Sequence, residues 1–98
     1  MRAGRTDGNQ TKIVDGLRKA GIAVSVLSSV GRGIPDLLCG FNGRNYLIEV
    51  KDPTKPKADR QLTPAQVIFF ANWQGQVAKV ETLDEALIII FENERKWI

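Results

Sequence analysis

Residues 35–51 read Pro-Asp-Leu-Leu-Cys-Gly-Phe-Asn-Gly-Arg-Asn-Tyr-Leu-Ile-Glu-Val-Lys. Two apolar runs flank the dipeptide Asn42-Gly43, which suits a two-residue type I′ turn because both central residues of that turn adopt positive φ. The stretch therefore predicts two antiparallel strands joined by a tight hairpin.

The turn decides which residues face each other across the hairpin. With residues 42 and 43 as the loop, Asp36 lies directly opposite Glu49. Opposed side chains share a face with their Cβ atoms about 4.5–5.5 Å apart, and Lys51 shares that face because side chains alternate along a strand. We expect two carboxylates and one ammonium group to converge at the open end of the hairpin.

These charges have two interpretations. Two adjacent carboxylates repel and are costly to desolvate unless a cation or a shared proton offsets the charge. Of the cations, Mg²⁺ and Mn²⁺ suit carboxylate and carbonyl oxygens. In such a site Lys51 would orient a water or neutralise charge on a phosphate. The alternative is a weak surface ion pair between Glu49 and Lys51, with Asp36 only starting a strand. The opposed Asp36 favours the metal site, because an ion pair needs no second carboxylate.

Composition narrows the function classes. The 98 residues suit one domain with 43% hydrophobic and 26% charged residues, and the net charge of +3 permits a nucleic-acid partner without requiring one. With no His and a single Cys39, a zinc site, an internal disulfide and His-dependent catalysis are excluded. No signal peptide or membrane-spanning run is visible, so we expect an intracellular protein of the cytoplasm or nucleoid with no membrane partner.

Apolar periodicity and turn signals predict a single α/β domain whose mixed sheet is flanked by helices, in the order helix, strand, strand, strand, helix, strand, helix. Residues 1–8 are expected to be a flexible basic N-terminus and residues 9–98 the domain. The expected helices are 9–20, 64–73 and 83–91, and the expected strands are 22–27, 36–41, 44–51 and 76–80.

The second helix opens with a capping box. Thr63 is the expected N-cap, Pro64 takes the first helical position, and Gln66 completes the box. Capping alone explains Gln66 in structural terms. The aromatic residues Phe69 and Trp73 recur at helical spacing, which favours the core or a subunit contact over base stacking.

A subunit contact is also suggested by the C-terminal part of the chain. Residues 86–91 are apolar almost all round the expected last helix, which indicates burial on more than one side. Together with Trp97 and Ile98, this run makes a homodimer interface plausible.

Basic residues near the hairpin are candidates for DNA contacts. Arg32 lies between two glycines in the loop before the hairpin, where a plain flexible turn is the alternative explanation. Lys55, Lys57 and Arg60 lie in the proline-containing segment 52–61, which starts directly after the hairpin. A bound phosphodiester would pass near this segment, although a solvated loop explains the same charges.

The ordered motifs resemble a known nuclease family. Gly33-Ile34-Pro35-Asp36 followed by Glu49-Val50-Lys51 is similar to the PD-(D/E)XK nuclease signature, and Leu62-Thr63-Pro64-Ala65-Gln66 follows it. Over residues 9–87 the chain most resembles the stand-alone virus-type replication-repair nuclease (VRR-NUC) domain. The resemblance implies a restriction-endonuclease-like core in which Asp36, Glu49 and the carbonyl of Val50 hold Mg²⁺ or Mn²⁺. It also implies that Lys51 activates water and that Gln66 lies beside the active site.

The same resemblance implies a function. It points to a metal-dependent DNA endonuclease that acts as a homodimer on branched DNA, similar to the archaeal Holliday-junction resolvases, with a role in DNA repair and a phage or prophage origin. One alternative is a nickase or nuclease for ordinary duplex or single-stranded DNA. The other is a DNA-binding module of the same fold that is catalytically weak or inactive.

The family usually supplies a further metal ligand, a Glu, from the first helix. Counting back from Gly21 with the spacing of the resolvases puts Gln10 at that position. A neutral Gln would weaken metal affinity without abolishing it. Asp7 is the other candidate, and Gln10 as an ordinary polar residue of the first turn is the third possibility.

Overall fold

The predicted hairpin forms the centre of the sheet in the structure of this protein, a computed structural model that describes residues 8–95. Strands β2 (Leu37–Phe41) and β3 (Arg44–Val50) pair antiparallel, with Phe41 opposite Arg44 at the turn. The loop residues Asn42 and Gly43 have φ of 52° and 78°, as a type I′ turn requires. The predicted turn and register are confirmed.

The sheet has four strands in the order β1-β2-β3-β4. Strand β1 (Ala23–Val26) pairs antiparallel with β2, and β4 (Gln76–Val80) pairs parallel with β3. The parallel pairing requires a long crossover, which contains the short 3₁₀ helix η1 (Lys57–Arg60) and the helix α2 (Pro64–Asn72). The predicted α/β order with a mixed sheet is therefore confirmed.

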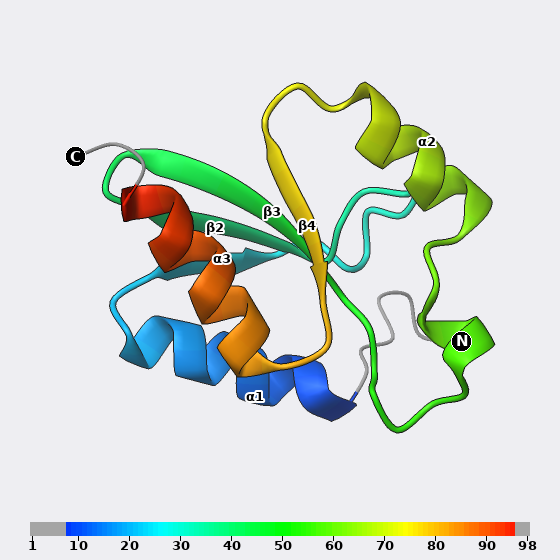
Figure 1. The fold of residues 1–98 in the computed structure, drawn as a ribbon, viewed down its shortest axis with the longest axis horizontal. Helices are drawn as coiled ribbons and strands as arrows, with labels where there is room; N and C mark the ends of the chain where they lie inside the picture. The colour runs from blue at the N-terminus through cyan, green and yellow to red at the C-terminus, as the bar shows by residue number, and fades with distance from the viewer. Residues whose placement is uncertain (1–7, 96–98) are drawn as a thin grey trace.

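Helices α1 (Gly8–Lys19) and α3 (Leu83–Arg95) lie side by side on one face of the sheet (Figure 1). Their inward residues recur at helical spacing and pack on alternate residues of the strands. The core between them consists mainly of Ile13, Val14, Leu17, Ile22, Leu37, Cys39, Tyr46, Ile48, Val50, Val80, Ala86 and Ile90. The described residues form one compact α/β domain around this core.

The expectation for the second helix is only partly met. The capping box at Thr63 is present, but α2 ends at Asn72, and Trp73 is its extended C-cap residue. None of the residues of α2 is buried, and Trp73 is 46% exposed. Figure 1 shows α2 on the side of the sheet away from α1 and α3. The prediction that its aromatic residues join the core is wrong, whereas the predicted subunit contact stays a prediction.

Some expectations lie outside the described residues. These are residues 1–7 of the expected flexible N-terminus, the metal ligand Asp7, and the contribution of Trp97 and Ile98 to a dimer interface. The remaining residue of the expected N-terminus, Gly8, begins α1 instead. Across residues 8–95, no helix combines the length and apolar content needed to cross a bilayer.

The loop before the hairpin makes a close contact with the first turn of α2, and this contact yields a stability prediction. Gly33 has φ of +79°, and a Cβ atom there would lie 2.5 Å from the carbonyl oxygen of Ala65. Gly31 has nearly the same φ, +78°, but a Cβ atom there would have no neighbour within 4 Å. We expect Gly33→Ala to lower the free energy of unfolding by about 2–4 kcal/mol and Gly31→Ala by about 1 kcal/mol.

Urea denaturation measures both changes, and Gly31→Ala is the control for the backbone penalty alone. Equal losses in the two variants would show that the contact between residue 33 and α2 does not constrain the loop.

Candidate metal and active site

The charged residues predicted from the hairpin line one polar pocket of about 290 Å³. The pocket lies where β3 ends, and α1, the loop before β2 and the segment after β3 all contribute to it. Its lining consists of Gln10, Asp36, Glu49, Val50, Lys51, Asp52, Lys55 and Asp59. Four carboxylates therefore face two lysine side chains, so the lining has an excess of negative charge that suits a cation.

Asp36 is held across the hairpin by hydrogen bonds. It lies one residue before β2, so the strand ladder stops at the preceding pair, Leu37 with Ile48. Its Oδ2 accepts a hydrogen bond from the backbone N–H of Val50 at 3.0 Å, and its Oδ1 accepts one from Ser28 Oγ at 3.2 Å. These bonds orient the carboxylate at the end of β3 that carries Glu49.

Glu49 is buried with one oxygen unsatisfied. Its side chain is on β3, and the residue is only 4% exposed. Its Oε2 accepts a hydrogen bond from Gln66 Nε2 at 2.9 Å, whereas its Oε1 is buried without a hydrogen-bond partner among the described residues. Burial, together with the negative charge of Asp36, raises the pKa of Glu49 to about 7. A buried carboxylate oxygen of this kind is rare unless it has a ligand.

Lys51 and Gln66 join the site from different elements. Lys51 is 8% exposed, and its Nζ lies 3.4 Å from Glu49 Oε2 and donates a hydrogen bond to Gln66 Oε1 at 2.9 Å. The same Oε1 accepts the backbone N–H of Thr63 at 2.9 Å, which is one half of the capping box of α2. The side-chain oxygen Oε1 of Gln66 accepts the hydrogen bonds from Lys51 and from Thr63 together. Gln66 can therefore cap α2 and support the site at the same time.

Gln10 lines the pocket from the first turn of α1, as the resemblance implied. It is 4% exposed, and its Nε2 donates a hydrogen bond to Ser28 Oγ at 3.1 Å. Ser28 in turn bonds Asp36, so a hydroxyl group connects the helix to the hairpin. Ser28 was not predicted, because a single serine in a loop carries no sequence signal for such a role.

Three more residues near the pocket escaped the sequence reasoning. Asn9 Nδ2 donates hydrogen bonds to the backbone carbonyls of Lys51 and Glu81, both at 3.0 Å, and so ties together the segments that follow β3 and β4. Asp52 and Asp59 line the pocket from the segment after β3. Hydrogen bonds from Thr54 lower the pKa of Asp52. The two aspartates of this segment follow Lys51 closely in the sequence, and this proximity was a signal that could have placed them at the pocket.

The predicted DNA contacts occupy different places. Lys55 lines the pocket, and Lys57 is exposed on η1. Arg60 instead forms an ion pair with Glu81, with 3.2 Å between Nη1 and Oε1. Arg32 is exposed and lies against α2 rather than at the pocket. The geometry thus brings one of the four basic residues to the pocket, and DNA contact at all four stays a prediction.

The donor atoms fit a hard divalent cation. Between residues 8 and 95, no three His, Cys, Asp or Glu side chains come together as a metal-binding group. However, Mg²⁺ commonly takes only one or two protein carboxylates and keeps several waters. Asp36 and Glu49 supply two carboxylates, and Val50 and Gln10, which also carry carbonyl oxygens, are among the residues that line the same pocket. Oε1 of Glu49, which has no hydrogen-bond partner among the described residues, is available as a further oxygen ligand.

No protein-family model, curated protein or solved structure matches the chain. The relation to the VRR-NUC domain therefore stays a resemblance carried by the motifs. Function has to be inferred from the geometry of the pocket.

The raised pKa of Glu49 predicts how the stability of the metal-free protein depends on pH. The native protein keeps the Glu49 proton up to about pH 7, whereas the ordinary value is 4.5. Between these values the native state binds more protons than the unfolded state, so the free energy of unfolding falls as pH rises. We expect the contribution of Glu49 to lower Tm by several degrees between about pH 5 and pH 8 in EDTA.

Thermal denaturation of wild type and Glu49→Gln at both pH values measures this contribution. The uncharged Gln should remove it and leave a flatter dependence of Tm on pH. An equal change of Tm with pH in the two proteins would contradict the raised pKa of Glu49.

Proposed function

We propose that this protein is a Mg²⁺- or Mn²⁺-dependent endonuclease that hydrolyses phosphodiester bonds in DNA. The single observation that carries the proposal is the buried, unsatisfied Oε1 of Glu49, in a pocket that also holds Asp36 and Lys51. A structural ion pair would not need a second carboxylate, nor would it leave one oxygen of Glu49 without a partner.

Each residue of the pocket has a distinct role in this proposal. Asp36, Glu49 and the carbonyl of Val50 would hold the ion, which, when bound, polarises the phosphate and makes a water molecule more acidic. The ammonium group of Lys51 positions the attacking water or stabilises the charge that develops on the phosphate oxygens. Gln66 keeps Lys51 and Glu49 in place through one hydrogen bond to each.

The substrate class rests on the motif resemblance and on charge. Lys55 at the pocket and the exposed Lys57 lie where the sugar-phosphate backbone would approach the site. The resemblance to resolvases favours branched DNA such as a four-way junction. A nickase for ordinary duplex or single-stranded DNA is the alternative within the same chemistry.

A second candidate function is a DNA-binding module without catalysis. The neutral Gln10 favours it, because the pocket then has one negative charge fewer than a site with an acid from the first helix. The complete set of Asp36, Glu49 and Lys51 favours the nuclease.

Metal binding is expected to stabilise the native protein. Mn²⁺ at millimolar concentration should raise Tm by several degrees, because it binds the native state preferentially. The rise should be larger near pH 8 than near pH 6, since Glu49 must lose its proton to bind the ion. Asp36→Asn should abolish the rise, whereas the control Asp15→Asn, which alters an exposed carboxylate on α1, should keep it.

Differential scanning fluorimetry with and without EDTA measures the shift. A rise of equal size in Asp36→Asn and in the wild type would remove Asp36 from the metal site.

Cleavage of end-labelled DNA tests the activity itself. We expect the wild type with Mg²⁺ or Mn²⁺ to make paired symmetrical nicks in a four-way junction and to leave the matched linear duplex intact. Lys51→Ala should reduce cleavage by about 100-fold or more, because it removes charge stabilisation in the transition state. Lys12→Ala is the control, since Lys12 is an exposed lysine on α1.

The pattern of cleavage separates the candidates. Equal cleavage of duplex and junction would favour the nickase. Binding of the junction without cleavage of either DNA would contradict the nuclease and favour the binding module.

A further inference from the structure

The segment between β3 and η1, together with η1 itself, supplies one side of the polar pocket without contributing to the core. Residues 52–61, which we call the strap, include Asp52, Lys55 and Asp59, and these three residues line the pocket. Every residue from 53 to 59 is exposed, so no buried apolar side chain holds this part of the chain against the sheet. The position of the strap therefore depends mainly on polar contacts near its two ends.

The end of the strap is held through Arg60. Lys79 Nζ donates a hydrogen bond to the backbone carbonyl of Arg60 at 3.1 Å, and Arg60 Nη1 donates one to Glu81 Oε1 at 3.2 Å. Both the backbone and the side chain of Arg60 are therefore bound by residues at the end of β4. Because Lys79 is paired with Glu49 across β4 and β3, these contacts place the end of the strap next to the site.

The start of the strap is held from α1 and β4. Asn9 Nδ2 donates hydrogen bonds to the carbonyls of Lys51 and Glu81, both at 3.0 Å. The backbone N–H of Lys51 donates to the carbonyl of Val80 at 2.9 Å. The residue before the strap is thus fixed beside Glu81, which also binds Arg60. Both ends of the strap are fastened to the residues at the end of β4.

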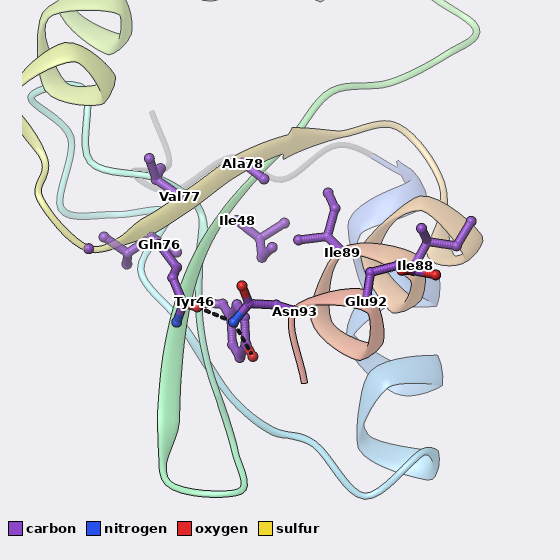
Figure 2. A pocket seen from close by; sticks show the side chains of 11 residues that line it. Tyr46, Ile48, Gln76, Val77, Ala78, Ile88, Ile89, Glu92 and Asn93 are labelled. Carbon is purple, nitrogen blue, oxygen red and sulfur yellow. Dashed lines mark hydrogen bonds between the residues drawn. The ribbon is translucent and has the colours of Figure 1, made fainter. Parts of the chain in front are cut away.

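The pair of Arg60 and Glu81 is partly shielded from solvent. Their side chains are 29% and 23% exposed, whereas those of the ion pair between Arg95 and Glu92 are 74% and 60% exposed. A partly buried pair is screened less by salt and water than an exposed one. Figure 2 shows Glu92 on α3, at a hollow whose lining includes no residue of the strap. The second pair therefore offers a matched control for the first.

We propose that Arg60 is a positioning residue, which fixes the strap so that Lys55 and Asp59 stand at the pocket. The inference rests on the proposed function, because it assigns the strap to the approach of the substrate. Lys55 attracts a sugar-phosphate backbone and Asp59 repels it, so their placement determines how a strand enters the pocket. In this role Arg60 acts through the strap and not by touching DNA, unlike the contact predicted for it from the sequence.

Limited proteolysis tests the position of the strap without DNA. Trypsin cleaves after Lys57 and Arg60, and cleavage requires the chain to open locally. Glu81→Gln removes the ion pair and keeps both cleavage sites, so it should speed cleavage there about three- to tenfold. Glu92→Gln, which removes the exposed pair on α3, should be cleaved at the wild-type rate.

DNA binding and cleavage test what the strap does. Glu81→Gln should raise the Kd for a fluorescein-labelled four-way junction at least threefold, measured by anisotropy in EDTA. The kcat at saturating junction should stay within about twofold of the wild type, since Asp36, Glu49 and Lys51 remain in place. A direct DNA contact by Arg60 predicts the opposite change in Kd, because loss of the neighbouring negative charge would leave the affinity unchanged or raise it.

A reversed ion pair provides a second test. Arg60→Glu combined with Glu81→Arg keeps the net charge and can form the same pair in the other direction. We expect this double variant to recover much of the wild-type resistance to cleavage after Lys57 and much of the wild-type Kd, whereas Arg60→Glu alone should lose both. A direct DNA contact by Arg60 predicts no recovery of the Kd.

The outcomes separate the strap from the nuclease. Equal proteolysis of the wild type and Glu81→Gln would overturn the role of Arg60 in holding the strap. Faster proteolysis with an unchanged Kd would show that the strap does not guide the substrate, and would overturn the positioning role. A wild type that binds the junction but cuts no DNA would contradict only the proposed nuclease, because the proteolysis and the Kd still test Arg60.

Discussion

The burial of Glu49 beside Asp36 is the constraint on which the rest of the site depends. A carboxylate that is 4% exposed and close to a second carboxylate is unfavourable unless its surroundings compensate for the charge. The surroundings do so only in part, through one hydrogen bond from Gln66 to Oε2 of Glu49 and through the nearby ammonium group of Lys51. The other oxygen remains unsatisfied. A cation at this position would offset the charge that the protein itself leaves incompletely neutralised.

The two faces of the sheet differ in what they contact. One face packs on α1 and α3 and supplies nearly all of the core. On the other face, β3 carries the apolar Leu47 and, two residues later, the charged Glu49. Leu47 lines an apolar groove between α2 and the sheet, and Glu49 lines the polar pocket. The groove and the pocket therefore adjoin each other on one surface. Helix α2 spans both, because Gln66 at its start reaches the pocket and Phe69, one turn later, lines the groove. The helix that contributes least to the core is therefore the one that connects the polar pocket with the apolar groove.

Local signals explain what could be predicted from the sequence. The turn at Asn42 fixes the hairpin register, and the register alone brings Asp36 near Glu49. The capping box is local as well, so the start of α2 was predictable. Ser28 and Asn9 were missed because their contacts cross 8 and 42 residues of chain and depend on how the elements pack. Periodicity also could not tell that α2 stays unburied, because an apolar stripe has the same spacing whether it faces a core or a partner.

The type I′ hairpin has a consequence for the folding pathway. Its contacts are among the most local in the sheet, whereas β4 joins β3 only after a crossover of more than twenty residues. Hairpins form in about 1–10 µs, and loop closure makes distant pairings slower. We expect the two carboxylates to approach each other early, before α2 has delivered Gln66 to hold Glu49. Repulsion between Asp36 and Glu49 within the nascent hairpin would then retard folding.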